Sequence, residues 1–301
     1  MPRRRFWVWL VVWGLVGCRP GVESASEPVV LATFTVIADM AQQVAGDRVR
    51  VESLVKPGVE IHSYEPTPRE IARIRQARLV LENGLGLEQW TARFYQQLQE
   101  VPRVTVSAGI TPVMIAPGQP DPHAWMSPRL ALIYVDNIRQ ALSRIDPDHA
   151  HFYTQNAQRY QQQIRAFDQK FQQFWQSIPA HRRYLVTCEG AFGYMARDYG
   201  FQPLYLWPMN AEQEGTPQQI RRVIDQVRAR QIPVVFCEST VNPQAQQQVA
   251  RETGARFGGI LYVDSLTVAT GPAPTYVRLL EHNLNTLRRG FSMLVSLEKI
   301  P

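Results

Sequence analysis

The chain has 301 residues, of which 45% are apolar and 19% are charged, and its formal net charge at pH 7 is +6. This length suits about two domains, and the mixture of apolar and polar residues beyond the first twenty argues against disorder, collagen, coiled coil and a multi-span membrane protein. Half of the net charge lies in Arg3, Arg4 and Arg5. The rest of the chain has no cluster of Lys and Arg with interleaved aromatics, which argues against a nucleic-acid partner.

The first residues resemble the leader of a bacterial lipoprotein. Residues 1–17 join the three arginines to an apolar run, Phe6–Val16, that is too short to span a bilayer, so we predict a signal peptide. The run ends in Leu15-Val16-Gly17-Cys18, which resembles a lipobox. We therefore expect Cys18 to carry lipid and residues 18–28 to form a flexible tether outside the cytoplasm. The alternatives are an ordinary signal peptide or an N-terminal membrane anchor.

Residues 29–145 alternate short runs rich in β-branched residues with amphipathic stretches. This order predicts a parallel sheet with helices on its faces, hence an α/β lobe. The predicted strands are Val29–Thr35, Arg50–Val55, Leu79–Leu81 and Arg103–Val106, and the predicted helices are Ile37–Ala45, Pro68–Gln76, Leu87–Leu98 and Pro128–Ile145.

Residues 146–178 predict one long helix. No glycine and no proline after Pro147 interrupt its first 32 positions, and large apolar residues recur at helical spacing. Asp146 is expected to be the N-cap and Pro147 the first helical residue. At 1.5 Å per residue the helix would be roughly 45–50 Å long, which is more than one lobe needs. We predict that it connects two lobes.

Residues 179–301 return to the alternating pattern and predict a second α/β lobe. The fold class is therefore α/β, with two lobes, each a mainly parallel sheet flanked by helices, joined by one long rigid helix. The predicted strands are Tyr184–Thr187, Phe201–Leu206, Val234–Phe236 and Ala255–Phe257, and the predicted helices are Gly193–Asp198, Pro217–Arg230, Pro243–Glu252 and Thr275–Leu297.

Four residues that can bind metal stand in loops or at strand ends, where open α/β sheets bind ligands. Each also has an ordinary interpretation. His62 would be a solvated loop residue, and His123, beside Trp125, a packed histidine bonded to a backbone carbonyl. Glu189 would face the dipole of the next helix, and Asp264 would simply end a strand. Taken together, the four predict two imidazoles from the first lobe facing two carboxylates from the second.

The segments around these residues resemble the four ligand motifs of one family, the solute-binding lipoproteins of ABC importers for manganese and zinc (cluster A-I). The segments are HSYEPTP, DPHAWMSP, EGAFGY and YVDSL. Their order and spacing, the lipobox and the long helix all agree, so the resemblance covers essentially the whole mature chain. One departure is Glu60-Ile61, where members usually have Asp-Pro; it concerns the loop before His62 and not His62 itself.

The resemblance implies a carrier and not an enzyme. His62, His123, Glu189 and Asp264 would bind the transported metal. The partners would be an ABC permease in the plasma membrane and its cytoplasmic ATPase. The protein would be a periplasmic or extracytoplasmic monomer, anchored by its lipid.

The ligand set favours Mn²⁺. Two neutral imidazoles and two carboxylates neutralise a divalent ion, and carboxylates that bind through both oxygens suit ions of higher coordination number than tetrahedral Zn²⁺. The family's zinc importers resemble a three-histidine pattern, with His where this chain has Glu189, and often have a His/Asp-rich loop before the second ligand. Residues 111–120 contain no histidine. Fe²⁺ and Zn²⁺ are the alternatives, since affinity order alone favours zinc over manganese.

Two cysteines remain once Cys18 is assigned to lipid. An even number outside the cytoplasm favours a disulfide between Cys188 and Cys237, and two separate buried thiols are the alternative. The pair resembles one in the manganese-binding members from cyanobacteria, which this chain resembles most within the family. A free thiolate at the site would be a soft ligand favouring zinc or copper. We hypothesise that the bond removes this ligand and holds the loop of Glu189, so that reduction weakens Mn²⁺ binding. The alternative is that the bond only stabilises the second lobe.

Three other functions are less consistent with the sequence. A metallohydrolase would need a signature such as HExxH, and a thiol oxidoreductase would be expected to show CxxC; neither occurs. An adhesin would need an exposed apolar patch. The remaining histidines are interpreted as ordinary surface or helix residues: His149, His151, His181 and His282.

Overall fold

The computed structural model describes residues 29–91, 100–210 and 215–297. The predicted signal peptide and tether, including Cys18, lie outside these residues. The first lobe is built on a four-stranded parallel sheet in the order β2-β1-β3-β4. Its strands are β1 (Val29–Ala32), β2 (Arg50–Ser53), β3 (Leu79–Glu82) and β4 (Arg103–Thr105).

Three helices cover this sheet, and two of them begin where the sequence predicts. They are α1 (Thr35–Ala45), α2 (Pro68–Gln76) and α3 (Pro128–Ile145). In α2, the Thr67 hydroxyl accepts the Glu70 N–H, and the Glu70 carboxylate accepts the Thr67 N–H, which makes a capping box. Of the predicted helix 87–98, residues 89–91 form a 3₁₀ turn, and most of the remainder lies outside the described residues.

A small hairpin in the first lobe was not predicted. It pairs β5 (Met114–Ala116) with β6 (Gln119–Pro120) in antiparallel register and precedes the loop that carries His123. Its backbone leads directly to Asp121, whose N–H donates to the Val113 carbonyl.

The long helix α4 (Ala150–Ser177) has 28 residues and is about 42 Å long at 1.5 Å per residue. It is shorter than predicted because Pro147–His149 form a separate 3₁₀ turn, η3. Pro147 begins that turn and Asp146 is its N-cap residue, as predicted. Its side chain caps no backbone N–H of that turn and instead accepts hydrogen bonds from His149 Nδ1 and the Tyr153 hydroxyl.

The second lobe contains two pairs of parallel strands whose inner members, β7 and β9, lie next to each other. A disulfide between Cys188 and Cys237 joins them, with the two Cα atoms 4.9 Å apart. The strands are β7 (Tyr184–Glu189), β8 (Gln202–Trp207), β9 (Val234–Glu238) and β10 (Arg256–Leu261), and the helices are α5 (Gly193–Tyr199), α6 (Pro217–Ala229), α7 (Gln244–Thr253) and α8 (Tyr276–Leu297).

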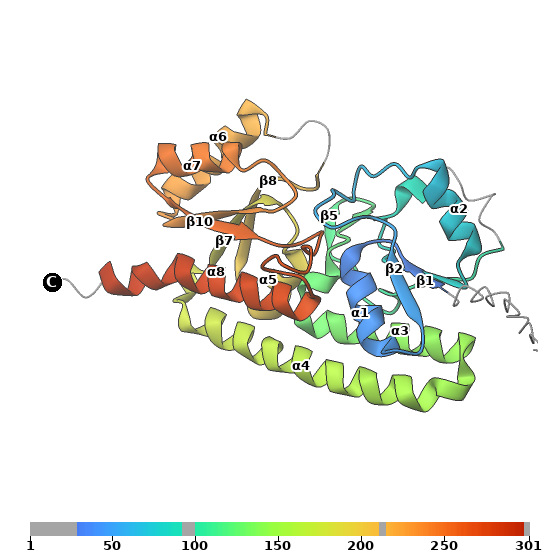
Figure 1. Cartoon of the computed structure of the whole chain (residues 1–301). Coiled ribbons are helices and arrows are strands. Elements are labelled where there is room, and N and C mark those ends of the chain that lie inside the picture. Colours follow the sequence, from blue (N-terminus) through green and yellow to red (C-terminus); the bar gives the residue numbers. More distant parts are fainter. Residues whose placement is uncertain (1–28, 92–99, 211–214, 298–301) are drawn as a thin grey trace, which may run out of the picture.

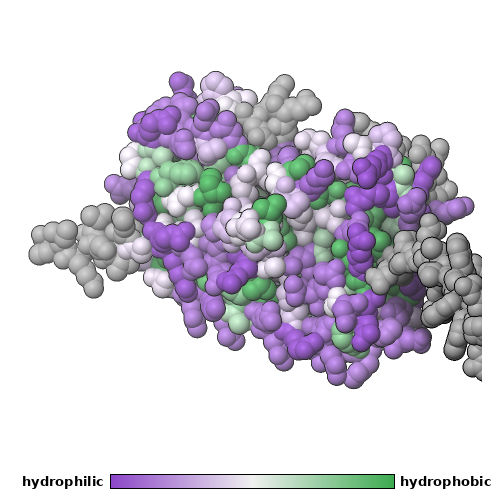
Figure 2. All heavy atoms as spheres, in the orientation of Figure 1, coloured by the Kyte–Doolittle hydropathy of each residue, from purple (hydrophilic) through white to green (hydrophobic). Residues whose placement is uncertain are grey.

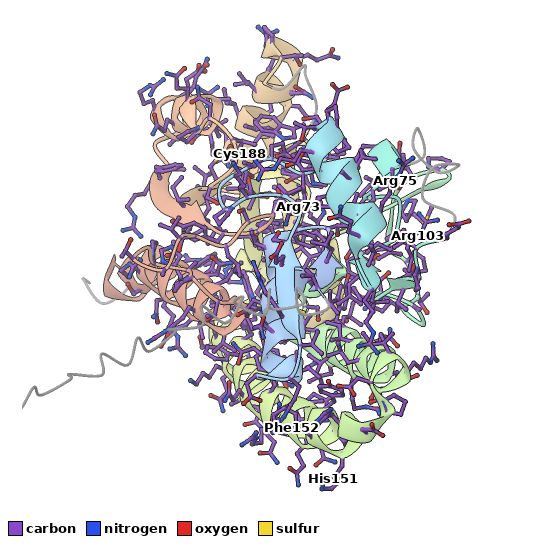
Figure 3. The ribbon with its side chains drawn as sticks, turned by 45° about the vertical axis from the view of Figure 1, so that its right-hand side comes forward. Arg73, Arg75, Arg103, His151, Phe152 and Cys188 are labelled. Carbon is purple, nitrogen blue, oxygen red and sulfur yellow. A yellow bond between two sulfur atoms is a disulfide. The ribbon has the colours of Figure 1, made fainter. Side chains whose placement is uncertain are left out.

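Helix α4 runs beneath both lobes, and α8 lies between it and the second lobe (Figure 1). Near the end of α4, Trp175 stacks on Phe201 of the second lobe, with ring centroids 4.2 Å apart. Near its start, Asn156 donates to the Val44 carbonyl of α1. In Figure 3, His151 and Phe152 at the start of α4 lie at the bottom of the molecule, and Cys188 lies in its upper part. One hydrophobic cluster includes side chains of both lobes, so the lobes share a core.

The surface of the described residues is largely hydrophilic. On the face in Figure 2, apolar side chains form small separate patches. Of the large apolar side chains that the structure describes, Val59, Met114 and Val268 are the exposed ones. A helix both long and apolar enough to cross a membrane is not found among residues 29–91, 100–210 and 215–297.

Candidate metal centre

The structure brings the four predicted ligand side chains together between the lobes. His62 comes from the loop between β2 and α2, and His123 directly precedes the 3₁₀ turn Ala124–Met126. Glu189 is the last residue of β7, and Asp264 lies in the loop after β10. One possible ligand atom from each residue lies within 4.8 Å of all the others.

The two imidazoles point their Nε2 atoms at each other and at the carboxylates. The Nε2 atoms are 3.1 Å apart. His62 Nε2 is 3.3 Å from Glu189 Oε1 and 3.7 Å from Asp264 Oδ1, and His123 Nε2 is 3.6 Å and 3.5 Å from the same oxygens. The side chains of Glu189 and Asp264 are completely buried.

This donor set fits a divalent cation. Within the described part of the chain, Glu189 Oε2 and Asp264 Oδ1 are buried oxygens without a hydrogen-bond partner. Buried polar atoms normally have one, and a bound ion is one explanation for such exceptions. A metal ion bound by His62, His123, Glu189 and Asp264 would satisfy both oxygens and the two Nε2 lone pairs.

Neighbouring groups bond the side chains of His123 and Asp264 and the backbone of Glu189. Asp121 Oδ1 accepts from His123 Nδ1 at 2.8 Å, which leaves the Nε2 lone pair of the neutral ring free for a metal. Asp264 Oδ2 accepts from the Thr240 hydroxyl at 3.2 Å. The carboxylate of Glu238 accepts the backbone N–H of Glu189 at 3.1 Å and thereby supports the end of β7.

In the metal-free protein, electrostatics favour a proton that stays bound among the proposed ligand side chains. Burial lowers the pKa of His123, but the charge of Glu189 and the Asp121 hydrogen bond outweigh it and raise that pKa well above its usual value. Burial and the charge of Asp264 raise the pKa of Glu189 well above its usual range. For Asp264, burial is outweighed by the two histidines, which lower its pKa. A cation would take over the role of this proton.

The predicted disulfide adjoins the centre. Cys188 directly precedes Glu189, and Cys237 precedes Glu238. Glu238 accepts the N–H groups of both Cys188 and Glu189 through one oxygen, and burial raises its pKa to about 8. The disulfide and Glu238 therefore hold the same strand end that carries Glu189.

Sequence reasoning assigned no role to Glu60, Asp121, Asn210 or Glu238. Asp121 had a usable signal, because it stands two residues before a predicted ligand and can reach its ring. Glu238 also had one, since it ends a strand next to Cys237. Asn210 had none: it follows β8 by three residues and reaches the centre only through the path of the folded chain.

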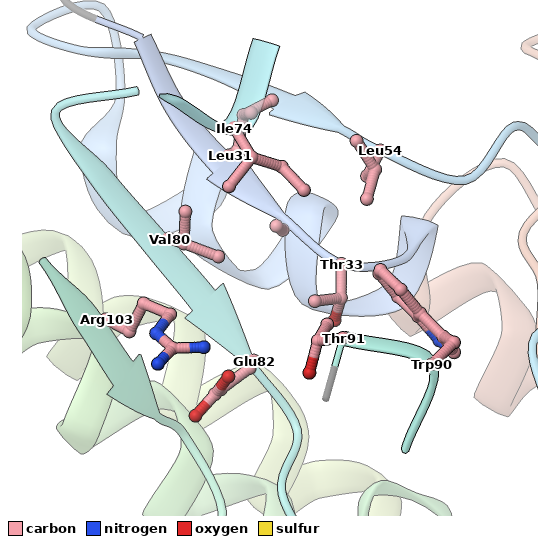
Figure 4. A pocket seen from close by; sticks show the side chains of 10 residues that line it. Leu31, Thr33, Leu54, Ile74, Val80, Glu82, Trp90, Thr91 and Arg103 are labelled. Carbon is pink, nitrogen blue, oxygen red and sulfur yellow. The ribbon is translucent and has the colours of Figure 1, made fainter. Parts of the chain in front are cut away.

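The remaining histidines lie apart from the cluster of possible ligand atoms. His149 and His181 are exposed or half-exposed near the ends of α4, and His282 in α8 contacts the Ile260 carbonyl. A small pocket in the first lobe, between β1, β3 and Trp90, is mainly apolar (Figure 4). None of the ten residues that line it belongs to the metal cluster.

Comparisons with known proteins identify the family of this chain. Residues 30–290 match the family model described as zinc-uptake complex component A, periplasmic (ZnuA). The iron-binding protein YfeA of Yersinia pestis is 51% identical over 273 residues, which cover 89% of this chain and 88% of that protein. The manganese-binding lipoprotein MntA of Halalkalibacterium halodurans is 34% identical over 87% of this chain and 88% of its own.

A solved structure shows that a related protein has the same fold as this chain. The Mn-bound periplasmic metal-binding protein of Candidatus Liberibacter asiaticus superposes with a TM-score of 0.81 at 40% identity, covering 87% of this chain and 98% of that one. The two-lobe α/β architecture with its long helix is thus confirmed. The chain belongs to the ZnuA family, the periplasmic metal-binding components of metal ABC importers.

Proposed function

We propose that this protein captures Mn²⁺ between its two lobes and delivers it to an ABC permease driven by a cytoplasmic ATPase. The observation that carries the proposal is the buried cluster of His62, His123, Glu189 and Asp264. Its two carboxylates neutralise a divalent ion, and each keeps one oxygen without a hydrogen bond in the described structure.

The choice of manganese rests on the oxygen-rich donors. Because Glu189 stands where the three-histidine zinc pattern has its third histidine, the site offers two imidazoles and up to four carboxylate oxygens. Such a set suits Mn²⁺ or Fe²⁺ better than tetrahedral Zn²⁺. Fe²⁺ is the second candidate, because the relative that is 51% identical is named an iron-binding protein.

Capture would need small movements. The histidines come from one lobe and the carboxylates from the other, but a shared hydrophobic core and the single connecting helix limit how far the lobes can separate. We propose that the ligand loops move while the lobes stay largely in place, and that docking on the permease promotes release.

The remaining assignments follow the same proposal. Cys18 would carry lipid, and residues 18–28 would tether a monomeric protein to the membrane on its extracytoplasmic side. The first lobe would comprise residues 29–145, the linking helix residues 146–178, and the second lobe residues 179–301. The MntA relative is named a lipoprotein, which supports the anchor.

Competitive metal binding tests the proposal. Protein purified from the native periplasm would be analysed for Mn, Fe and Zn, and the metal-free protein would then be titrated with each ion under anaerobic conditions. We expect Mn²⁺ in the isolated protein and one high-affinity site per chain. Bound zinc or iron without manganese would refute the choice of metal, and no tight divalent binding would refute the carrier function.

A further inference from the structure

Asn210 contacts three carboxylates from both lobes at once. Its backbone N–H donates to Glu189 Oε1 at 2.8 Å. Its side-chain Nδ2 donates to Glu60 Oε2 at 2.5 Å and, more weakly, to Asp264 Oδ2 at 3.4 Å. Glu189 and Asp264 are the proposed ligands of the second lobe, whereas Glu60 belongs to the loop of His62 in the first.

The orientation of the Asn210 amide is set by a neighbour that can only donate. The Trp207 Nε1–H at the end of β8 donates to Asn210 Oδ1 at 2.9 Å. Because the indole nitrogen carries no acceptor, the amide oxygen must face Trp207 and the NH₂ group must face the carboxylates. Asn210 is itself buried, at 4% exposure.

Glu60 links this amide to a proposed metal ligand of the first lobe. Its Oε1 accepts the backbone N–H of His62 at 2.7 Å, and its Oε2 accepts from Asn210. One carboxylate therefore holds the His62 backbone and the Asn210 side chain together. Hydrogen bonds to a charged carboxylate are stronger than those between neutral groups.

Resting on the proposed function, we infer that Glu60 and Asn210 form a latch between the lobes that controls how fast the metal leaves. They are positioning residues, because they act through His62, Glu189 and Asp264. Outward movement of the His62 loop, which would open the centre, must break the bond between Glu60 and Asn210. The pair thus determines how fast the ion leaves more than it determines how well the ion fits its ligands.

Two other contacts between the lobes lack this connection. The Ser127 hydroxyl bonds Asp198, and the Trp125 indole donates to the Val263 carbonyl. Neither contact engages the carboxylate of a proposed ligand. Ser127→Ala is therefore a matched control that removes a bond between the lobes without touching the latch.

The test measures Mn²⁺ dissociation into excess chelator by stopped flow for the full chain. Glu60→Ala and Asn210→Ala should each raise the dissociation rate about tenfold, and the double Ala variant should add little, because both changes break the same bond. Ser127→Ala should stay within about twofold of the wild type. Thermal unfolding of each metal-free variant checks that it is folded.

Exchanging donor and acceptor separates the latch from general packing. Asn210→Asp alone sets a carboxylate against Glu60 and should release Mn²⁺ fastest. Combining it with Glu60→Gln restores one donor–acceptor pair in the opposite sense at unchanged total charge, and it should slow release several-fold relative to Asn210→Asp. Dissociation rates of both Ala variants within twofold of the wild type, or no recovery in the exchanged pair, would overturn the latch.

A readout without metal keeps this inference separate from the carrier function. Backbone amide exchange in residues 58–62 of the metal-free protein should be faster in Asn210→Ala than in the wild type and unchanged in Ser127→Ala. If the wild type binds no divalent ion, the proposed function fails, and the exchange data still test the latch. Equal exchange in Asn210→Ala and the wild type would contradict it.

Discussion

Replacing Asp264 by alanine should abolish tight Mn²⁺ binding while leaving the fold intact. Its side chain is completely buried, and Oδ1 lies 3.5 Å and 3.7 Å from the two imidazole Nε2 atoms. The change removes one of the two negative charges that would face the ion and an oxygen that has no partner within the described chain.

The expected loss is large. Changing groups that only orient metal ligands costs about 10–100-fold in affinity, so removing a charged ligand should cost at least about 100-fold. That is about 2.7 kcal/mol at 1.36 kcal/mol per tenfold. The fold should persist, because the change breaks few hydrogen bonds. Among the described residues, Oδ2 accepts only from the Thr240 hydroxyl and the Asn210 amide.

Two assays measure the effect. Calorimetry gives the affinity directly. In thermal unfolding, Mn²⁺ at about 100 times the wild-type dissociation constant adds about 2.7 kcal/mol of stability, or roughly 4–5 °C for a chain of this size. The same concentration should shift Asp264→Ala by only about 1 °C. Asp225→Ala, on the exposed face of α6, is the control and should match the wild type. Near-normal Mn²⁺ affinity in Asp264→Ala would refute the ligand assignment.

Three further predictions concern the disulfide, the proton on His123 and the buried carboxyl group of Glu88. Reducing the disulfide, or replacing Cys188 and Cys237 together by serine, should weaken Mn²⁺ binding about tenfold in calorimetry. The reason is that the strand end carrying Glu189 loses a covalent support. An unchanged affinity would mean that the bond only stabilises the second lobe. Because the pKa of His123 is raised, Mn²⁺ binding at pH 7 should release about one proton, and the affinity should increase as pH rises. Calorimetric titrations in buffers of different ionisation enthalpy detect the released proton. Binding heats that do not depend on the buffer would contradict this prediction. Burial raises the pKa of Glu88 from 4.5 to about 7, so the folded state binds the carboxyl proton of Glu88 more tightly than the unfolded state does. The resulting stability is fully present below pH 4.5 and is lost as pH rises to 7. Glu88→Gln should remove that slope, up to about 1.4 kcal/mol per pH unit, from urea unfolding between pH 5 and pH 7, and an unaltered slope would exclude Glu88 as its source.

Elements with local signals were predictable. The bounds of α2 match the prediction because Thr67, Pro68 and Glu70 form a capping box that depends only on neighbouring residues. The start of α4 was predicted three residues early, because Pro147–His149 form a separate 3₁₀ turn. The strands β5 and β6 contain only three and two residues, too few to show a strand period.

The metal centre also has parts that were predictable from the sequence and parts that were not. The four motifs identified His62, His123, Glu189 and Asp264 as candidates because each motif is a continuous stretch of sequence, and the folded chain does bring them together. The long-range contacts of the groups around them were not predictable. Asn210 meets Glu60 across 150 positions, and Glu238 reaches the Glu189 N–H across 49, so both contacts exist only once the sheets and the shared core have formed.

The most direct test of the central claim is anomalous diffraction at the manganese and zinc edges on crystals of protein purified from its native compartment. The proposal predicts one manganese peak per chain, bound by Nε2 of His62 and His123 and by oxygens of Glu189 and Asp264. A peak at the zinc edge alone would contradict the choice of metal, and a peak away from these four side chains would contradict the site.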